Sequence, residues 1–268
     1  MNRGNLADVG RIFYGTAVAA MGVQTIYYND LPYMLIPPTH FPATILIVLT
    51  YISGILLILA GACIIFKKRP KPMSLLLGTI LLLIFCFYYI PYEFMDTSNY
   101  MHLGEWENAE KELALSSGAF VIAGCFSEKK ENPLFRLLAK LIPLGPVFFS
   151  ITITSFGIDH FLYAKDVSDY IPSWIPNHMF WTYFAGTALI GSGMAIMLKI
   201  KTGLSAGLLG TMIFTWFIIL HIPKVVTASS AADREGEITS AFLALAYSGI
   251  AFVIASPVKK QEFNQAHV

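Results

Sequence analysis

The sequence predicts an all-α integral membrane protein with eight transmembrane helices, arranged as two tandem four-helix units in parallel orientation. The first observation is composition: 56% of the residues are hydrophobic, 13% are charged and the mean hydropathy is +0.62. Soluble proteins carry about 25% charged residues, and a soluble domain of this length would not bury so much apolar surface. The other two observations are the spacing of the apolar segments and a repeated set of short motifs.

A helix needs about 20 mostly apolar residues to cross the hydrocarbon core of a bilayer. Eight segments meet this requirement, at residues 9–28, 43–66, 73–92, 112–127, 144–164, 180–199, 204–223 and 239–256. The fourth and eighth are short and rich in serine and glycine, which predicts helices packed against other helices. The first has no convincing A-x-A cleavage site, so we expect a retained span and not a removed signal peptide.

The lysines and arginines indicate the orientation, because these residues accumulate on the cytoplasmic side of a membrane. With eight spans, fourteen of the eighteen fall on the side that holds both termini. The opposite loops hold Lys111, Lys165, Lys224 and Arg234. We therefore expect a protein of the bacterial inner membrane, embedded in the lipid bilayer, with cytoplasmic N- and C-termini.

Short motifs recur along the chain at an offset of 132 residues, which indicates an internal repeat. The matching pairs are Tyr51 and Tyr183, Gly54 and Gly186, Gly61 and Gly193, Gly78 and Gly210, Pro91 and Pro223, Ser116 and Ser248, and the "FVIA" of 120–123 and 252–255. In the first span the offset is 135, where Gly22 matches Gly157. We interpret the chain as two copies of one four-helix unit.

The repeat divides the chain into a first unit at 1–127, a linker at 128–143, a second unit at 144–256 and a tail at 257–268. Because each unit has an even number of spans, both have the same orientation, as in transporters with parallel repeats. The linker is charged and then amphipathic, which predicts a short cytoplasmic helix at the membrane interface. Its predicted inward side carries Leu134, Leu137, Leu138 and Leu141.

The stretch "GIDHFLY" at 157–163 places Asp159 and His160 side by side near the end of an apolar span. An ionisable group inside a span is expensive and must face protein or water, so it is a functional hypothesis by default. The first unit has Gln24 and Thr25 at the matching positions. We therefore expect any site to belong mainly to the second unit.

The predicted topology brings further polar residues to the same depth, near the outer interface. The candidate catalytic residues are Asp159, His160 and His221. The candidate residues for binding a cofactor are His160, Tyr163, His178 and Trp181. At the position of His221 the first unit has Tyr89, which again points to the second unit.

An aspartate beside a histidine can hold and deprotonate a quinol, because histidine changes its charge near neutral pH. In this interpretation Asp159 orients His160, and Tyr163 adds a second hydrogen bond to the ring of the ligand. Two histidines on separate helices could instead ligate a haem, or with Asp159 a metal ion. No second pair of histidines lies deeper in the membrane, so we favour a quinone over haem and assign no metal ligand.

Several of these residues also have a purely structural interpretation. Histidines at span ends are natural polar anchors, and the loop aromatics Tyr170, Trp174 and Trp181 are typical of an interfacial belt. The acidic residues expected only to solubilise the outer loops and cap helices are Glu105, Glu107, Glu110, Glu235 and Glu237. Thr239 or Ser240 suits the N-cap of the eighth helix. The cysteines Cys63, Cys86 and Cys125 lack a CxxC spacing, and we expect them to be small buried hydrophobes.

The second half resembles the DoxX-like membrane proteins. The resemblance is carried by "FGIDHFLYA" at 156–164, "YIPSWIP" at 170–176, "YFAGTALIGSGMAI" at 183–196 and "TWFIILHIP" at 215–223. It covers 145–256 well and 9–127 more weakly. The resemblance implies a four-helix unit, present here twice, and a redox-associated role like that of the membrane subunit of thiosulfate:quinone oxidoreductase.

Two functional hypotheses follow. The first is a redox-associated subunit that interacts with quinone and, if it takes part in an oxidoreductase reaction, acts with a partner redox protein. The second is a non-enzymatic small-molecule carrier or a membrane assembly or accessory factor, since parallel repeats with polar residues in the membrane also describe transporters. The apolar inner halves of the spans favour a one-sided, outward-facing pocket. Nucleotide and hydrolase motifs are absent from the sequence, and no basic run suits nucleic acid.

Overall fold

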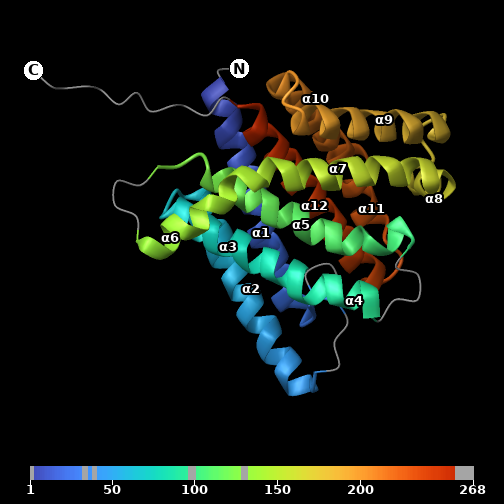
Figure 1. Ribbon diagram of the computed structural model, residues 1–268. Coiled ribbons are helices and arrows are strands. Elements are labelled where there is room, and N and C mark those ends of the chain that lie inside the picture. The colour runs from blue at the N-terminus through green and yellow to red at the C-terminus, as the bar shows by residue number, and fades with distance from the viewer. Residues whose placement is uncertain (1–2, 32–35, 38–40, 96–100, 128–131, 257–268) are drawn as a thin grey trace, which may run out of the picture.

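The computed structural model describes residues 3–31, 36–37, 41–95, 101–127 and 132–256, and every regular element within these ranges is helical (Figure 1). The long helices are α1 Arg3–Tyr28, α2 Ala43–Ile65, α3 Pro70–Ile84, α5 Glu107–Ala123, α7 Gly145–Leu162, α9 His178–Met197, α10 Thr202–Trp216 and α12 Ala231–Ala255. The short elements are η1 Phe85–Tyr89, α4 Ile90–Met95, η2 Leu103–Trp106, α6 Pro133–Leu138, η3 Ala139–Leu144, α8 Ala164–Tyr170, η4 Phe217–His221 and α11 Ile222–Thr227.

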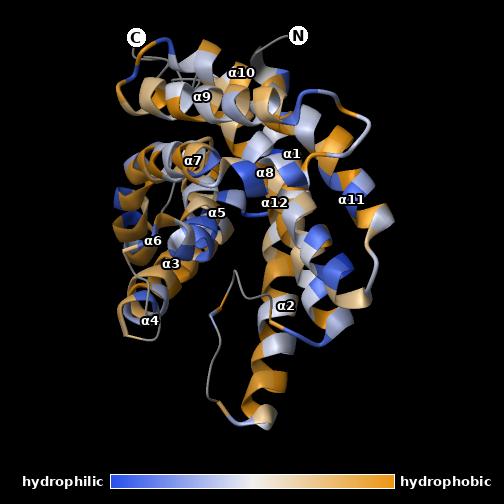
Figure 2. Ribbon diagram, turned by 90° about the vertical axis from the view of Figure 1, so that its right-hand side faces the viewer, coloured by the Kyte–Doolittle hydropathy of each residue, from blue (hydrophilic) through white to orange (hydrophobic). Residues whose placement is uncertain are grey.

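Within the described part, seven helical stretches are long and apolar enough to cross a membrane. They are α1, α2, α3 with η1 and α4, α6 through α7, α9, α10 with η4 and α11, and α12. Large apolar side chains on their outer faces stay exposed, such as Ile52 and Leu59 on α2 and Leu208 on α10. Figure 2 shows α2 as a mostly hydrophobic helix that projects beyond the rest of the bundle. Soluble monomers do not expose such surfaces, so the chain is a multi-pass integral membrane protein.

The two helices expected to pack against protein do so. In α12, 72% of the most apolar stretch is buried, and α5 buries every residue from Glu112 to Ala123. With 17 residues, α5 is shorter than the seven candidate spans. Its serines, glycine and alanines let neighbouring helices approach closely, and α3, α7 and α12 all contact it.

Helix crossings recur in the two halves at the offsets seen in the sequence. A Cβ atom added to Gly22 of α1 would lie 2.5 Å from the carbonyl oxygen of Gly54 on α2. A Cβ added to Gly157 of α7 would lie 2.8 Å from the carbonyl oxygen of Gly186 on α9. In both places the two backbones are in direct contact, which only glycine allows at this distance.

The third and fourth long helices of each half also pair in the same way. The Ser116 hydroxyl on α5 donates to the carbonyl oxygen of Gly78 on α3 at 2.7 Å, and Ser248 on α12 donates to Gly210 on α10 at 2.9 Å. Both α3 and α10 continue into a π-helical turn, η1 or η4. Each turn is followed by a proline of the matching pair, whose missing N–H interrupts the regular hydrogen bonding of the helix.

The first long helix of each half packs against the last long helix of the other half. α1 lies along α12, where a Cβ added to Gly10 would be 2.4 Å from the carbonyl oxygen of Gly249. α7 lies along α5, where a Cβ added to Gly145 would be 3.0 Å from the carbonyl oxygen of Ser117. The two halves are therefore interlocked and share one core.

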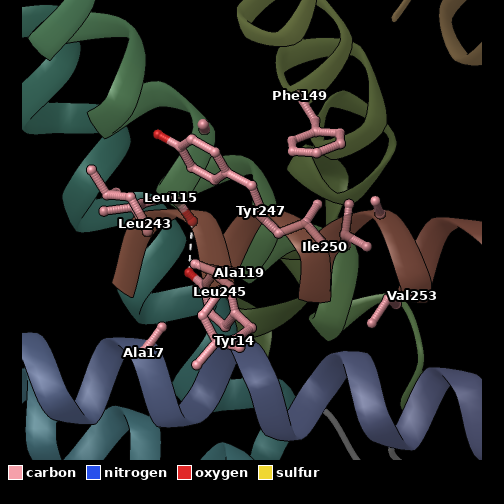
Figure 3. Packing of buried hydrophobic residues seen from close by; sticks show 14 of the residues in the cluster. Tyr14, Ala17, Leu115, Ala119, Phe149, Leu243, Leu245, Tyr247, Ile250 and Val253 are labelled. Carbon is pink, nitrogen blue, oxygen red and sulfur yellow. Dashed lines mark hydrogen bonds between the residues drawn. The ribbon is translucent and has the colours of Figure 1, made fainter. Parts of the chain in front are cut away.

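The middle of this core holds two tyrosines from opposite halves. The Tyr14 hydroxyl of α1 donates to the carbonyl oxygen of Leu115 on α5 at 2.6 Å (Figure 3). At the matching positions of the other half, the rings of Phe149 and Tyr247 lie 6.4 Å apart at their centroids. The Tyr247 hydroxyl has no hydrogen-bond partner, although the residue is buried, with only 7% of its surface exposed.

The linker is helical, and part of its leucine face packs against the protein. α6 and η3 lead directly into α7, and residues 128–131 of the predicted linker lie outside the described residues. Leu138 and Leu141 pack together with Phe135 against a buried cluster of α3 and α5. Leu134 and Leu137 are exposed and do not contact this cluster, so the position of these two at the membrane interface stays a prediction.

The eighth helix begins earlier than predicted, at Ala231. Its N-cap is Ser230, whose hydroxyl oxygen accepts a hydrogen bond from the backbone N–H of Asp233 at 3.0 Å. The predicted cap at Thr239 or Ser240 is therefore wrong, because a serine further upstream already satisfies the helix terminus. The two glutamates assigned to the loop before this helix belong to its first turns.

The cysteines are free, as their spacing predicts. Cys63 is half-buried, whereas Cys86 and Cys125 are exposed. The expectation that all three are buried is therefore wrong for the latter two. On the outer face of a membrane protein a thiol meets lipid, where it behaves as a small apolar group.

We expect Gly10→Ala to destabilise the fold by about 1–3 kcal/mol, because the added methyl group would overlap the α12 backbone and push the helices apart. Gly191 on α9 has nothing within 4 Å of an added Cβ, so Gly191→Ala is the matched control and should be neutral or slightly stabilising. Thermal unfolding in mild detergent measures both. A Gly10→Ala protein as stable as the wild type would contradict the close approach of α1 and α12.

Candidate functional site

A cavity of about 1170 Å³ lies among α7, α8 and the N-terminal halves of α9 and α12, and reaches Leu189 on α9 and Tyr247 on α12. η2, α5, α10 and η4 complete its wall. The residues predicted from sequence that line it are Asp159, His160, Tyr163, Trp181 and His221. They come from α7, α9 and η4, so the fold brings together residues that are up to 62 positions apart in the sequence.

His178 does not line this cavity among the described residues. It begins α9, and its Nε2 lies 3.2 Å from the carbonyl oxygen of Pro172 in the preceding loop. This contact closes the loop between α8 and α9. His178 therefore has a local structural role at the start of α9.

His160 is held by the backbone one turn earlier in α7. Its Nδ1 lies 2.7 Å from the carbonyl oxygen of Phe156. A carbonyl oxygen only accepts hydrogen bonds, so Nδ1 carries the hydrogen of this contact. In the neutral ring Nε2 is then the nitrogen that can accept a proton or a hydrogen bond. The predicted orientation of His160 by Asp159 is wrong, because Phe156 fixes the ring.

Asp159 faces the cavity with an oxygen that has no partner. Its Oδ1 is shielded from solvent and makes no hydrogen bond, and Glu107 and Lys111 of α5 act on it through their charges. Lys111 itself forms an ion pair with Glu107 at 2.7 Å. An unsatisfied buried oxygen costs about 1–3 kcal/mol, so Asp159 is a position where a ligand with a donor group would be stabilised.

Tyr163 ends α7 and packs against η2. The backbone N–H of Gly104 donates to the Tyr163 hydroxyl oxygen at 3.3 Å, and a Cβ on Gly104 would lie 3.1 Å from the tyrosine ring. The hydroxyl thus accepts one bond from the protein, and its own hydrogen remains for a second. Tyr163 therefore has a structural role in this contact, and its predicted hydrogen bond to a ligand stays a prediction.

Aromatic rings cover the opposite side of the cavity. Trp181 and Trp216 meet edge to face with ring centroids 6.1 Å apart, and Tyr170 lies 6.3 Å from the His221 ring. The His221 Nδ1 is buried without a hydrogen-bond partner. Trp174 is 64% exposed, whereas Tyr170 and Trp181 are half-buried and pack against a cluster that includes Ile171 and Ile175 of the α8–α9 loop. The aromatic belt stays a prediction, and for Tyr170 and Trp181 packing in the cavity wall is a role that the belt does not include.

Tyr170 also fixes an acidic side chain in the cavity wall. Its hydroxyl donates to Oε2 of Glu237 on α12. Burial, together with this hydrogen bond, raises the pKa of Tyr170, so the phenol keeps the proton that it donates. Lys224 lies over the outer face of the same ring, 4.2 Å from its centroid. Glu237 is consequently a wall residue and not a solubilising loop residue.

Sequence reasoning missed the contribution of α5. Glu107 and Lys111 line the cavity together with Tyr247 of α12, so both halves of the chain build the site, although the second unit supplies most of it. A signal was present: Glu107 and Lys111 are four residues apart, which places them on one face of a helix. The predicted span began five residues too late to include both.

Two further glutamates of α5 lie inside the bundle. Glu112 is fully buried, and neither of its carboxyl oxygens has a hydrogen-bond partner. Glu110 has one shielded oxygen without a partner. The solubilising role expected for Glu110 is therefore wrong. At the position that corresponds to Glu112 the second half has Ala244, which lines the cavity.

The described residues contain no group of three or more His, Cys, Asp or Glu side chains arranged to hold a metal ion. In comparisons with known proteins, no family model matches the chain, and neither a curated protein nor a solved structure matches it. The resemblance to DoxX-like proteins rests on the quoted segments and stays a prediction. Fold and cavity together define a multi-pass helical membrane protein with a ligand-sized cavity at one end of the bundle.

We expect Tyr170→Phe to lower the free energy of unfolding by about 1–3 kcal/mol, because it leaves the Glu237 carboxyl without its donor. The control is Tyr27→Phe, since Tyr27 is 80% exposed and should tolerate the change. Thermal unfolding in detergent distinguishes the two variants. Equal melting temperatures would show that the Tyr170–Glu237 bond does not support the cavity wall.

Proposed function

We propose that this protein is a DoxX-like membrane protein with a redox-associated role, and that its cavity binds the ring of a quinone-type molecule. The observation that carries the proposal is the position of His160. Its Nδ1 is fixed on the Phe156 carbonyl, which leaves Nε2 for a molecule in the cavity. A quinol releases protons when it is oxidised, so a positioned acceptor in an aromatic cavity supports this chemistry.

The cavity suits such a ligand in size and in lining. Pockets for small molecules measure about 300–1,000 Å³ and combine apolar walls with a few placed polar groups. Here Phe156, Trp181 and Trp216 supply aromatic surface, and the Tyr247 hydroxyl and Asp159 Oδ1 are polar groups without partners. These two unpartnered groups favour a ligand that carries hydrogen-bonding oxygens on a ring.

A bound quinone would supply the redox chemistry, and the chain would supply position and proton exchange. The two tryptophans would confine the ring, the Tyr163 hydroxyl would donate a hydrogen bond, and His160 would take a proton at Nε2. Asp159 is next to His160 and at the wall of the same cavity, so it would pass the proton towards solvent. Electrons would be exchanged with a partner redox protein.

We further propose that the chain consists of two tandem four-helix units with eight spans, of which α5 is the fourth. The paired crossings at Gly22 and Gly157 and the paired serine bonds of α5 and α12 support this arrangement. The distribution of lysine and arginine supports cytoplasmic termini. This orientation places the cavity on the outer side of the inner membrane.

Single-cysteine labelling tests this orientation in a variant without the three native cysteines. Asp169 on α8 and Ser229 before α12 are exposed at the cavity end, and Lys199 is exposed at the other end. We expect a membrane-impermeant maleimide to label Asp169→Cys and Ser229→Cys in intact cells, and Lys199→Cys only after permeabilisation. The reverse pattern would reject the orientation, and labelling of all three in intact cells would reject the span count.

A non-enzymatic carrier or accessory factor is the second candidate. The observation that favours it is the number of acidic side chains around the cavity. A recess lined by one sign of charge concentrates solutes of the opposite sign, which suits capture and transfer as well as catalysis. In this case His160 would couple binding to protonation without turnover.

The test of the quinone proposal is ligand retention. We expect His160→Ala to lower the quinol retained under reducing conditions in mild detergent, measured by mass spectrometry, by up to about tenfold, since the quinol O–H donates to the neutral Nε2 and one lost neutral hydrogen bond is worth about 0.5–1.5 kcal/mol. His178→Ala is the matched control, because His178 does not line the cavity. Wild-type quinol content in His160→Ala, or no quinol in the wild type reconstituted with it, would refute the proposal.

A further inference from the structure

The lining of the cavity is strongly acidic. The acidic residues that line it are Glu105, Glu107, Asp159, Asp166, Asp233 and Glu237. Among its described lining residues, Lys111 is the one lysine or arginine, and it is paired with Glu107 at 2.7 Å. The remaining titratable bases of the lining are His102, His160 and His221. At neutral pH a recess of this composition attracts positive charge and repels negative charge.

The two acids Asp159 and Glu107 correspond, by the sequence offsets, to a pair of uncharged polar residues in α1 and α12. There the Gln24 side-chain amide on α1 donates to the Thr239 hydroxyl of α12 at 2.6 Å and to the Glu235 carbonyl at 2.8 Å. By the same offsets, Asp159 on α7 stands for Gln24, and Glu107 on α5 stands for Thr239. A neutral hydrogen bond between two helices is thus replaced by two acidic side chains. Two such groups repel each other, and Lys111, which is paired with Glu107 and acts on Asp159, supplies one positive charge against the two acids.

The rest of the wall suits a cation that also carries apolar groups. Trp181, Trp216 and Tyr163 present aromatic rings, and aromatic faces attract ammonium-like cations within about 6 Å. Tyr170 already binds one such group, since Lys224 lies over its ring. The Tyr247 hydroxyl, on a residue that is 7% exposed, has no partner in the protein. Its oxygen carries a partial negative charge and belongs to the lining of the same recess, so it attracts a cation without a hydrogen bond.

We propose that the cavity selects an amphipathic organic cation, such as a quaternary ammonium or phosphonium compound, with its charge between Asp159 and Glu107 and its apolar groups against the tryptophans. This inference rests on the proposed function only in that the same cavity binds a ligand, and it goes beyond it by naming a second class of ligand, distinct from the neutral quinone. The cavity volume of about 1170 Å³ accommodates a compound of this size, whereas an inorganic cation would leave the aromatic walls unused.

The test compares two probes of the same shape and opposite charge, tetraphenylphosphonium and tetraphenylborate. Saturable binding to the purified full-length protein in detergent is measured by equilibrium dialysis against protein-free micelles. We expect tetraphenylphosphonium to bind at least about tenfold more tightly than tetraphenylborate. Removing one nearby charge in a partly buried site changes a binding energy by more than 1 kcal/mol, so Asp159→Asn with Glu107→Gln should weaken phosphonium binding at least about tenfold.

Two further variants test whether phosphonium binding changes in the direction expected from charge, and supply a control. Lys111→Gln removes the lining cation, so it should strengthen phosphonium binding, in the opposite direction to the acid variants. Asp169→Asn removes an exposed acid of α8 that does not line the cavity, and it should change nothing. If the double variant does not fold, Glu107→Gln alone serves, because the Glu107 side chain is 52% exposed.

The outcomes separate this inference from the quinone proposal. Equal or tighter binding of tetraphenylborate, or phosphonium binding that the acid variants leave unchanged, would overturn the inference. A short-chain ubiquinone that binds and depends on His160, together with no phosphonium binding, would refute the inference and support the proposed function. Phosphonium binding that depends on Asp159 and Glu107, without ubiquinone binding, would support the inference and refute the quinone proposal. If neither probe binds, both are wrong.

Discussion

The structure depends on direct contact between helix backbones at a few glycines. In lipid there is no hydrophobic force between helices, so association relies on close packing and on hydrogen bonds between them. At Gly10 with Gly249 the backbones leave no room for a side chain, and at Gly145 with Ser117 an added Cβ would be in tight contact with the α5 backbone. These two contacts hold α1 on α12 and α7 on α5. Each joins a helix of the N-terminal half to a helix of the C-terminal half, so the two halves form one interlocked bundle.

This interlocking decides which polar side chains meet. The polar residue near the end of the first helix in one half faces the last helix of the other half, so Gln24 meets Thr239. By the same geometry Asp159 lies against the beginning of α5, where Glu107 and Lys111 stand. The cavity therefore combines α7, α8, α9, α10, η4 and α12 with η2 and α5 from the first half. A second half folded alone would lack the wall that carries Glu107.

The sequence predicted the helices and the residues that gather in the cavity better than it predicted their partners. Apolar length located the spans, and an isolated acid and base in one span identified Asp159 and His160. Neither signal reveals which helix of the other half lies opposite, because that depends on backbone contacts at glycines. Glu107 was therefore assigned to a solvated loop, and Asp159 was expected to orient His160 although a carbonyl one turn away does so. Helix starts were missed where charged residues form the first turns, as in α5 and α12.

Positions that match by the sequence offsets differ between the two halves in whether their polar groups are hydrogen-bonded. Around α1 two polar contacts join neighbouring helices: the Tyr14 hydroxyl donates to the Leu115 carbonyl, and the Gln24 side-chain nitrogen donates to Thr239, although Oε1 of Gln24 has no partner. Around α7 the corresponding positions leave Asp159 and Tyr247 with atoms that have no partner. Such atoms lower the stability of a fold, and here the same interlocked bundle contains joined groups that offset the loss. The second half thus supplies most of the cavity wall of acids and aromatic rings, while the first half contributes α5 to that wall and the backbone contacts that hold it in place.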